Sequence, residues 1–273
     1  MNSKMTERVV QPMTRTPNSS LTNALRILKS FSIDHPEWTL SEISEVIGVS
    51  KSTACRLVQT LESEGFMFQI EPFNTYRLGA SVLALSHTVA GQFAMFKDTT
   101  SYLKQLTELT GESSHIAVLD QAEVIYIQKE DSRHRVQLRS HIGRRNPAHC
   151  TASGQAILAY MEPADIEKLY ASGLASCTPR TIVSLEKLQH TLASVRQQGY
   201  SISNGEFMAH IVSVGAPIFN KRGQAFASIS VAGLNKRMLP NLPRMVSCVR
   251  QTSEAITESI CARSKDVDID KLI

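Results

Sequence analysis

Five neighbouring positions combine cations, hydroxyls and an amide on one short stretch of chain. They are Lys51, Ser52, Thr53, Arg56 and Gln59. Cationic side chains bind phosphates, and guanidinium, amide and hydroxyl groups form hydrogen bonds with base edges in a DNA groove. The stretch therefore favours contact with a nucleic acid.

Two short helices separated by a glycine must position these side chains. Residues 39–47 predict a helix that opens with a capping box of Thr39 and Glu42 and ends at Gly48. Ser50 is expected to cap a second helix that runs to Glu64. The apolar residues of this second helix recur at three- and four-residue spacing, so they share one face and leave the polar side chains on the other. These apolar residues are Ala54, Leu57, Val58 and Leu61.

The flanking segments predict a winged helix-turn-helix domain over residues 20–79. A helix over residues 21–31 would complete a core of three helices. Gly65 would end the second helix, and the alternating runs 66–70 and 74–78 predict a hairpin. This wing would bring Arg77 near the DNA backbone. We therefore expect Ser50, Lys51, Ser52, Thr53, Arg56, Gln59 and Arg77 to contact double-stranded DNA, with residues 51–56 entering the major groove.

Charge gives this interpretation only weak support. The chain carries a net charge of +4 with a pI near 8.8, but residues 1–90 contain eight Lys and Arg against eight Asp and Glu. DNA binding therefore requires the cations to be segregated onto one surface. Helix-glycine-helix patterns with a polar face also occur in proteins that bind no DNA, so a protein-interaction module or a small-molecule sensor is the alternative.

The rest of the chain predicts an α+β domain. We expect a flexible arm over residues 1–19, a linker helix over 80–96, a second domain over 97–263 and a tail over 264–273. In the second domain, hairpins are predicted over 114–128 and 211–231 and a further strand over 134–139. Helices are predicted over 99–110, 152–160, 163–172, 185–198 and 240–261. Helices mixed with hairpins in this order indicate an antiparallel sheet.

Several classes of function are not indicated. No stretch predicts a signal peptide or a membrane span, so we expect a cytoplasmic protein. The five cysteines, scattered along the sequence, indicate neither a disulfide framework nor a metal site. His149 and Cys150 are adjacent but lack an orienting acid, which argues against a nucleophilic pair and against an enzyme. His115 is expected to lie in the core or line a pocket, and Met208 to fill a gap.

Three further segments, together with the winged module and the linker helix, carry a resemblance to a family. They are residues 147–159, the pair Gly199–Tyr200 and the strand 215–219. In this order the segments resemble the IclR family of bacterial transcription regulators, over nearly the whole chain after about residue 20. The resemblance implies a GAF-like effector-binding domain, a homodimer or homotetramer, and no cofactor. It also implies repression or activation of a catabolic or carbon-metabolism operon in response to a small organic acid.

The effector site is expected where small residues open a helix. Backbone amides of Thr151, Ala152, Ser153 and Gly154 could hold a carboxylate there. The resemblance places further contacts at Ser203 or Asn204, at Ser213 and at Ser230. Ser213 and Ser230 could instead form hydrogen bonds with the neighbouring backbone. This chain departs from the family pattern, because Ser203 and Asn204 stand where an acidic pair is common, and a pocket without that carboxylate would repel an anion less.

A run of cations precedes this site. Its members are Lys129, Arg133, Arg135, Arg139, Arg144 and Arg145, offset by Glu130 and Asp131. Such a run is most often a solvated face. A subunit or polymerase contact and a rim that attracts anions are the alternatives.

Overall fold

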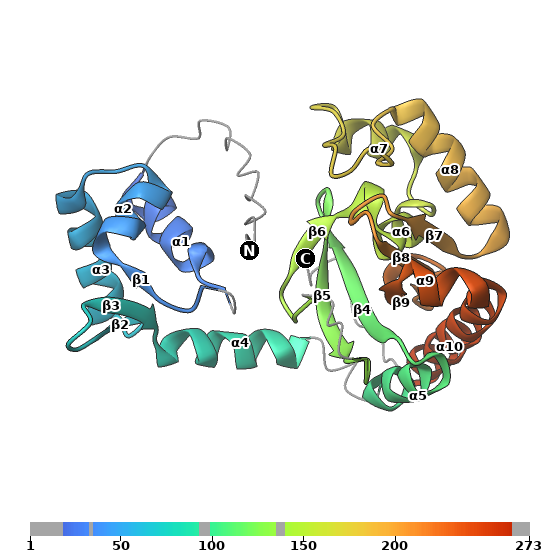
Figure 1. Ribbon diagram of the computed structural model, residues 1–273, viewed down its shortest axis with the longest axis horizontal. Helices are drawn as coiled ribbons and strands as arrows, with labels where there is room; N and C mark the ends of the chain where they lie inside the picture. The colour runs from blue at the N-terminus through green and yellow to red at the C-terminus, as the bar shows by residue number, and fades with distance from the viewer. Residues whose placement is uncertain (1–18, 33–34, 93–98, 135–139, 264–273) are drawn as a thin grey trace, which may run out of the picture. The chain divides into compact units, whose positions relative to one another are not determined.

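The computed structural model describes residues 19–32, 35–92, 99–134 and 140–263, which form two compact units that meet in sequence between Gln92 and Phe93 (Figure 1). The predicted arm (apart from residue 19), residues 93–96 of the predicted linker helix, the strand over 134–139 (apart from His134) and the tail lie outside the described residues.

The first unit is a small helical domain with a three-stranded sheet. Its helices are α1 (Ser20–Ser30), α2 (Leu40–Ile47), α3 (Lys51–Ser63) and α4 (Ala80–Gln92). Its strands are β1 (Trp38–Thr39), β2 (Met67–Ile70) and β3 (Thr75–Leu78), antiparallel in the order β1-β3-β2. The predicted helix-turn-helix and wing are confirmed, and β1 is an additional strand that the sequence did not predict.

Local chemistry fixes the turn between α2 and α3. Thr39 accepts a hydrogen bond from the Glu42 amide, and the Glu42 carboxylate accepts one from the Thr39 amide, which completes the predicted capping box. Gly48 follows with φ of 69°, in the left-handed region. Behind the turn, Ile27, Ile43 and Val58 are almost completely buried and join the three helices into one core.

The second unit is built on a six-stranded antiparallel sheet. Its strands are β4 (Ser113–Asp120), β5 (Glu123–Glu130), β6 (Arg145–Pro147), β7 (Ser201–Asn204), β8 (Ile211–Phe219) and β9 (Ala225–Leu234). They lie in the order β6-β5-β4-β9-β8-β7. The two predicted hairpins are confirmed, while β6 and β7 were not predicted.

Helices cover both faces of this sheet (Figure 1). One face packs against α5 (Thr100–Thr110) and α10 (Leu242–Arg263), and the other packs against α6 (Ala152–Leu158), α7 (Pro163–Leu169) and α8 (Leu185–Gln198). Short helices, at Ala148–Cys150, at α9 (Asn235–Met238) and at Leu239–Asn241, connect the main elements. The last helix thus begins two residues later than predicted.

A glycine brings α6 close to the sheet. A Cβ atom at Gly215 in β8 would lie 2.6 Å from the carbonyl oxygen of Ala152. Any side chain at this position would push the first turn of α6 away from the strand. The absence of a side chain therefore sets how closely the helix opening approaches β8 and β9.

Candidate DNA-binding face and effector cavity

The polar side of α3 is exposed as expected. Among the seven residues predicted to contact DNA, the six in this helix and its cap are all exposed: Ser50, Lys51, Ser52, Thr53, Arg56 and Gln59. The opposite side packs into the core through Ala54 and Val58. The helix therefore presents one continuous polar face that starts at its N-terminus.

Capping occupies part of this face. Ser50 Oγ accepts a hydrogen bond of 3.3 Å from the Thr53 amide and lies 2.9 Å from Thr53 Oγ1 and 3.0 Å from Ser52 Oγ. These hydroxyls hold the start of the helix together. Arg56 and Gln59 lie one to two turns further on and line a shallow groove beside Ser20 of α1.

Arg77 lies in the wing, but it has an acidic partner. Its Nε donates a hydrogen bond of 2.9 Å to Glu37 Oε1, and its Nη2 contacts the same oxygen. The hydrogen bonds from Arg77 and Thr75 lower the pKa of the Glu37 carboxyl, which keeps that group charged. The pair is exposed, so Arg77 could release Glu37 and bind a phosphate instead. In the unbound chain, however, the carboxylate of Glu37 neutralises the charge of Arg77.

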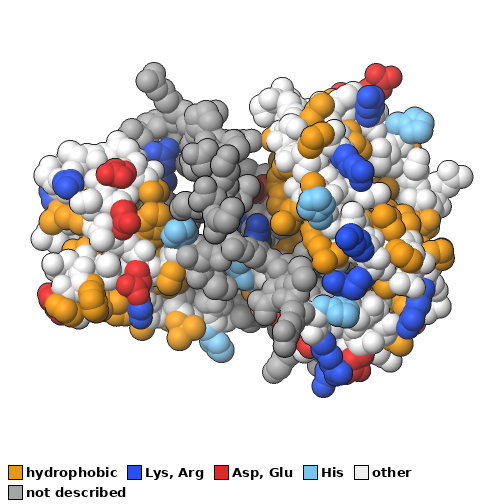
Figure 2. Space-filling model, viewed as in Figure 1, with side chains coloured by type: hydrophobic (Ala, Val, Ile, Leu, Met, Phe, Trp, Pro, Cys, Tyr) orange, Lys and Arg blue, Asp and Glu red, His pale blue; other side chains and the backbone are white. Residues whose placement is uncertain are grey.

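Charges on the surface are mixed. Figure 2 shows Lys, Arg, Asp and Glu side chains interspersed on the visible face of the first unit. In this view the described residues of the first unit form no broad basic face. Lys51 and Arg56 are the two cations of α3, and both are exposed.

The second unit contains a cavity of about 60 Å³ between the sheet and the start of α6. Its lining comes from all six strands or their ends and from the first turn of α6. The lining residues are His115, Tyr126, Ser140, Arg144, Asn146, Thr151, Ala152, Ser153, Ser203, Phe207, Met208, Ile211, Ser213, Ser230 and Ala232.

Strand register explains why these side chains meet. His115 in β4 is paired with Ser230 in β9, and Ala232 in β9 is paired with Ser213 in β8. Ser213 is in turn paired with Ser203 in β7. Paired residues in adjacent strands point to the same face of a sheet. The four strands thus present one row of side chains, polar except for Ala232, on the face that α6 covers.

The polar groups of the wall are connected to one another. Ser153 Oγ donates a hydrogen bond of 2.8 Å to Ser230 Oγ, which joins α6 to β9. Ser203 Oγ donates one of 2.9 Å to the Cys150 carbonyl oxygen, which joins β7 to the segment before α6. These two bonds tie the helix opening to the central strand β9 and to the edge strand β7.

A neutral histidine forms the floor of the cavity. His115 stacks on Tyr126 with ring centroids 4.5 Å apart, and its Nε2 lies 2.8 Å from Ser140 Oγ. Burial, assisted by the positive charge of Lys129, lowers the pKa of His115 to about 3. Its buried Nδ1 has no hydrogen-bond partner among the described protein groups. The ring is therefore neutral, and one of its nitrogens is unpaired among the described groups.

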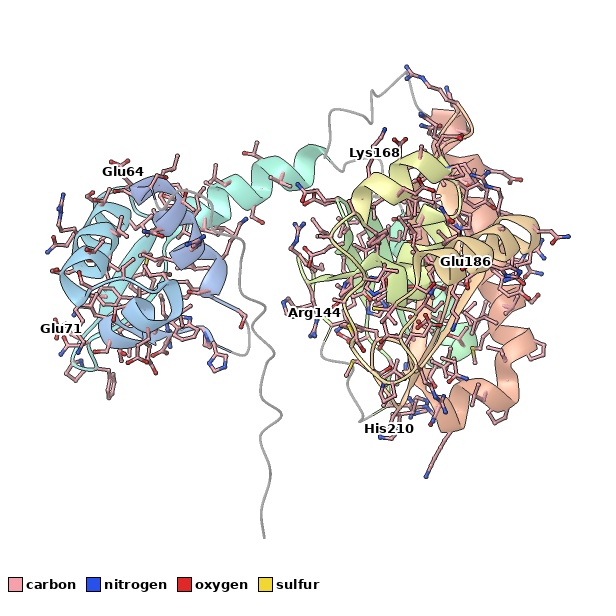
Figure 3. All side chains as sticks on the ribbon, turned by 90° about the horizontal axis from the view of Figure 1, so that it is seen from above. Glu64, Glu71, Arg144, Lys168, Glu186 and His210 are labelled. Atoms are coloured by element: carbon pink, nitrogen blue, oxygen red, sulfur yellow. The ribbon has the colours of Figure 1, made fainter. Side chains whose placement is uncertain are left out.

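The single charged side chain among the described lining residues is Arg144. It precedes β6 at the edge of the sheet (Figure 3), and its Nε donates a hydrogen bond of 3.2 Å to Asn146 Oδ1. No Asp or Glu belongs to the described lining. The electrostatic balance of the cavity therefore favours an anion.

One carboxylate lies close to the wall without lining it. Glu206 Oε2 accepts a hydrogen bond of 2.8 Å from Gln155 Nε2, and Gln155 Oε1 accepts one of 2.7 Å from Ser201. Burial raises the pKa of Glu206 to about 7, although the hydrogen bonds from Gln155 and the Asn204 backbone oppose this shift. Near neutral pH a substantial fraction of this carboxyl is uncharged, which limits its repulsion of an anion.

Sequence comparison assigns both units. Residues 20–69 match the family model for the IclR helix-turn-helix domain, and residues 87–258 match the model for the bacterial transcriptional regulator IclR C-terminal domain. The chain belongs to the IclR family of transcription regulators.

Individual relatives of this IclR-family chain agree with the assignment. The HTH-type transcriptional regulator XynR of Escherichia coli K12 is 32% identical over 220 residues, which cover 80% of this chain and 87% of that protein. The structure of a putative IclR transcriptional regulator from a Silicibacter species superposes with a TM-score of 0.74 at 30% identity, covering 89% of this chain and 96% of that one. An IclR homolog from Microbacterium hydrocarbonoxydans, complexed with 4-hydroxybenzoate, has a TM-score of 0.78 at 22% identity, covering 89% and 99%, and supports the fold.

Six of the eight predicted effector residues line the cavity of this IclR-family protein: Thr151, Ala152, Ser153, Ser203, Ser213 and Ser230. Two do not. Asn204 accepts a hydrogen bond of 3.3 Å from Arg180. The amide of Gly154 donates to Thr151 Oγ1 at 3.3 Å and the amide of Thr151 to the Ala148 carbonyl oxygen at 3.5 Å, so the expectation of free amides at these two positions was wrong. A Cβ atom at Gly154 would lie 2.2 Å from the Ala148 carbonyl oxygen, which indicates a packing role.

The structure also corrects or completes three other predictions. Met208 lines the cavity, where a gap-filling role was expected. The predicted cationic run is divided: Arg144 lines the cavity, Arg145 pairs with Asp120 and Glu123, and Arg133 is exposed, while Arg135 and Arg139 lie outside the described residues. Two cysteines that are far apart in sequence lie close in space, because the Sγ atoms of Cys150 and Cys177 are 3.9 Å apart.

Two structural observations concern membrane and metal binding. Within the described residues, no helix is long and apolar enough to cross a membrane. Across the same part of the chain, no group of three or more His, Cys, Asp or Glu side chains is arranged to hold a metal ion.

Proposed function

We propose that this protein binds a small organic acid in the cavity beside α6 and changes its affinity for an operator in response. The observation that carries this proposal is the composition of the described lining, which contains Arg144 and no carboxylate. Arg144 would attract the carboxylate of the acid, and the hydroxyls of Ser153, Ser213 and Ser230 would orient it. Tyr126, Phe207 and Met208 supply an apolar wall for the rest of the ligand.

The size of the cavity sets an expectation for the ligand. The cavity of about 60 Å³ has room for a few ordered waters. This matches an acid of a few heavy atoms, and a flat aromatic acid would require the exposed side chain of Met208 to move. The 4-hydroxybenzoate bound by the Microbacterium homolog makes aromatic acids the second class to test.

On the DNA side, we infer that two copies of the winged domain bind the half-sites of a near-palindromic operator. Ser50, Lys51, Ser52, Thr53, Arg56 and Gln59 would face the major groove, and Arg77 the backbone. Helix α4 supports a homodimer, because its apolar side chains Leu83, Leu85 and Val89 are exposed in the single chain. A helix that is apolar all round is normally covered. The same dimer could associate further into a tetramer, and DNA binding supports a cytoplasmic location.

We propose that the protein regulates a catabolic or carbon-metabolism operon, either as a repressor or as an activator. An acid changes operator occupancy only if it binds the DNA-competent and incompetent arrangements with different affinity. A coupling of about 1 to 3 kcal/mol is typical.

The test is a fluorescence-anisotropy titration with DNA from upstream of the gene itself, across a salt series, with and without a panel of small aliphatic acids and 4-hydroxybenzoate. We expect binding that weakens with salt and changes with one acid. Absence of binding at low salt would favour the alternative, a sensor or protein-interaction module without sequence-specific DNA binding. If the protein binds DNA and no acid changes its affinity, only the proposed response to an organic acid is refuted.

A further inference from the structure

Two thiols meet immediately beside the cavity, although 27 residues separate them in sequence. Cys150 Sγ and Cys177 Sγ lie 3.9 Å apart, and both cysteines are in the free thiol form. A disulfide bond requires a separation of about 2.05 Å. The two sulfur atoms would therefore need to approach each other by roughly 2 Å, which side-chain rotation and small backbone shifts can supply.

The environments of the two thiols differ. Cys150 is fully buried, whereas Cys177 is exposed. Burial, with smaller contributions from the Cys177 sulfur and Glu206, raises the pKa of the Cys150 thiol. An oxidant in solution can therefore reach Cys177 first, and Cys150 is placed to react with the product.

The surrounding contacts hold the two thiol-bearing segments together. His149, adjacent to Cys150, places its Nε2 2.9 Å from the Ala175 carbonyl oxygen. The Cys177 amide donates a hydrogen bond of 3.0 Å to Thr181 Oγ1. The first contact joins the two segments next to the sulfur atoms, and the second fixes the turn that carries Cys177.

Both segments connect directly to the cavity wall. Cys150 precedes Thr151, which caps α6, and its carbonyl oxygen accepts the hydrogen bond from Ser203. On the other side, Thr178 Oγ1 donates to the Gly205 carbonyl oxygen at 2.7 Å and Thr181 Oγ1 to that of Glu206 at 2.6 Å. Phe207 and Met208, which line the cavity, follow next. A covalent bond between the sulfurs would join the two walls.

We propose that Cys150 and Cys177 form a redox modification site, in which a hydroperoxide converts the two thiols into a disulfide that restrains the wall of the effector cavity. The thiol chemistry is independent of the proposed function, and only its consequence for acid binding rests on it. A reversible pair of this kind is the form of disulfide found in reducing compartments.

The reaction is balanced with hydrogen peroxide as the oxidant. The Cys177 thiolate attacks one peroxide oxygen, the O–O bond breaks, and a sulfenic acid and, after protonation, one water are formed. Cys150 sulfur then attacks Cys177 sulfur, the S–O bond breaks, and the Cys150 proton leaves with the hydroxide as a second water. The two thiols lose two electrons and two protons, and the peroxide gains them. A dithiol reductant reverses the change.

The first test detects the bond itself in the full-length protein. The reduced protein is treated with hydrogen peroxide, its remaining thiols are alkylated, and its peptides are analysed by mass spectrometry with and without dithiothreitol. We expect a reducible cross-link between the peptides of Cys150 and Cys177. Cys177→Ser should abolish this cross-link and Cys261→Ser should retain it. No such cross-link, or disulfides that join two chains through Cys177, would overturn the proposal.

The second test measures the restraint without requiring an effector. Amide hydrogen exchange is compared between reduced and oxidised protein over residues 150–154 and 205–208. We expect exchange in the oxidised protein to slow by about tenfold in both segments, because a cross-link opposes local opening. Cys177→Ser treated with peroxide should show no change. A cross-link that forms without altering exchange would refute the connection to the cavity, while the acid titration tests the proposed function separately.

Discussion

Ser153 Oγ donates a 2.8 Å hydrogen bond to Ser230 Oγ, although 77 residues separate the two serines in sequence. Ser153 lies in the first turn of α6 and Ser230 in the middle of β9, and both line the cavity. The bond is the direct polar link between the helix that opens the site and the central part of the sheet. Each hydroxyl has further hydrogen-bonding capacity that a bound carboxylate could use.

We expect Ser230→Ala to weaken acid binding by about fivefold, since one hydrogen bond contributes about 1 kcal/mol. Operator binding without acid should be unchanged, because β9 belongs to the other unit. Isothermal titration calorimetry with the acid that responds in the anisotropy experiment measures the change. Ser228→Ala is the matched control: Ser228 lies two residues earlier in β9, is equally buried, and its Oγ has no partner among the described groups. Equal losses in both variants would show that general packing is responsible.

Arg56→Ala should weaken operator binding and reduce the slope of log affinity against log salt by about 1, if Arg56 contacts a phosphate. Arg77→Ala should have a smaller effect, because Glu37 already neutralises Arg77 in the unbound chain. Anisotropy titrations across a salt series measure both. Lys187→Ala removes one exposed charge from α8 and serves as the control. If Arg77→Ala weakens operator binding more than Arg56→Ala does, this prediction is wrong.

The sequence predicted the two domains' elements well where the determining interactions are local. The capping box of Thr39 and Glu42, the left-handed Gly48 and the cap at Ser50 lie within a dozen residues, so they could be recognised directly. The short strands β6 and β7 were missed because each pairs along only one edge and offers three or four residues of pattern.

The cavity was predicted only in part, because several of its residues are brought together by strand pairing that is distant in sequence. Ser213 and Ser230 were found from the resemblance, but His115 becomes their neighbour only through the pairing of β4 with β9, which are more than a hundred residues apart. No local pattern specifies that register. The alternation of side chains along β4 could have indicated which face of the sheet His115 occupies. The sequence positions of Cys150 and Cys177 did not indicate that their sulfur atoms lie close together.

Glu206→Gln should change how stability depends on pH. Burial raises the pKa of Glu206 from 4.5 in the unfolded chain to about 7, so the folded state binds the proton more strongly. The contribution of this group to the free energy of unfolding is fully present below pH 4.5 and is lost as the pH rises toward 7. His115 and His149 act in the opposite direction, because burial lowers their pKa values and the folded state resists their protonation.

Because both histidines are present in the wild type and in Glu206→Gln, the difference between these two proteins reports on Glu206 alone. The melting temperature of the wild type relative to Glu206→Gln should therefore fall between pH 5 and pH 7.5. The amide oxygen of Gln can still accept the hydrogen bond from Gln155. Thermal melts at constant ionic strength measure the difference, with Glu186→Gln in the exposed first turn of α8 as the control. A difference that stays constant over this range would mean that the carboxyl titrates normally in the folded chain.

Leu83→Glu should weaken the proposed dimer. Leu83 is 73% exposed in the single chain, on a helix whose other apolar side chains include Leu85 and Val89. Burying a Leu side chain contributes about 1.5 to 3 kcal/mol, and a buried unpaired charge costs more, so the dissociation constant should rise by at least about tenfold. Sedimentation equilibrium measures this constant, and helix content by circular dichroism shows that the fold is retained. Thr88→Glu adds the same charge at an exposed polar position of α4 and should have the smaller effect. If the stoichiometry and affinity of Leu83→Glu match those of the wild type, α4 does not form the subunit contact, and the apolar surface of this helix must be covered in another way.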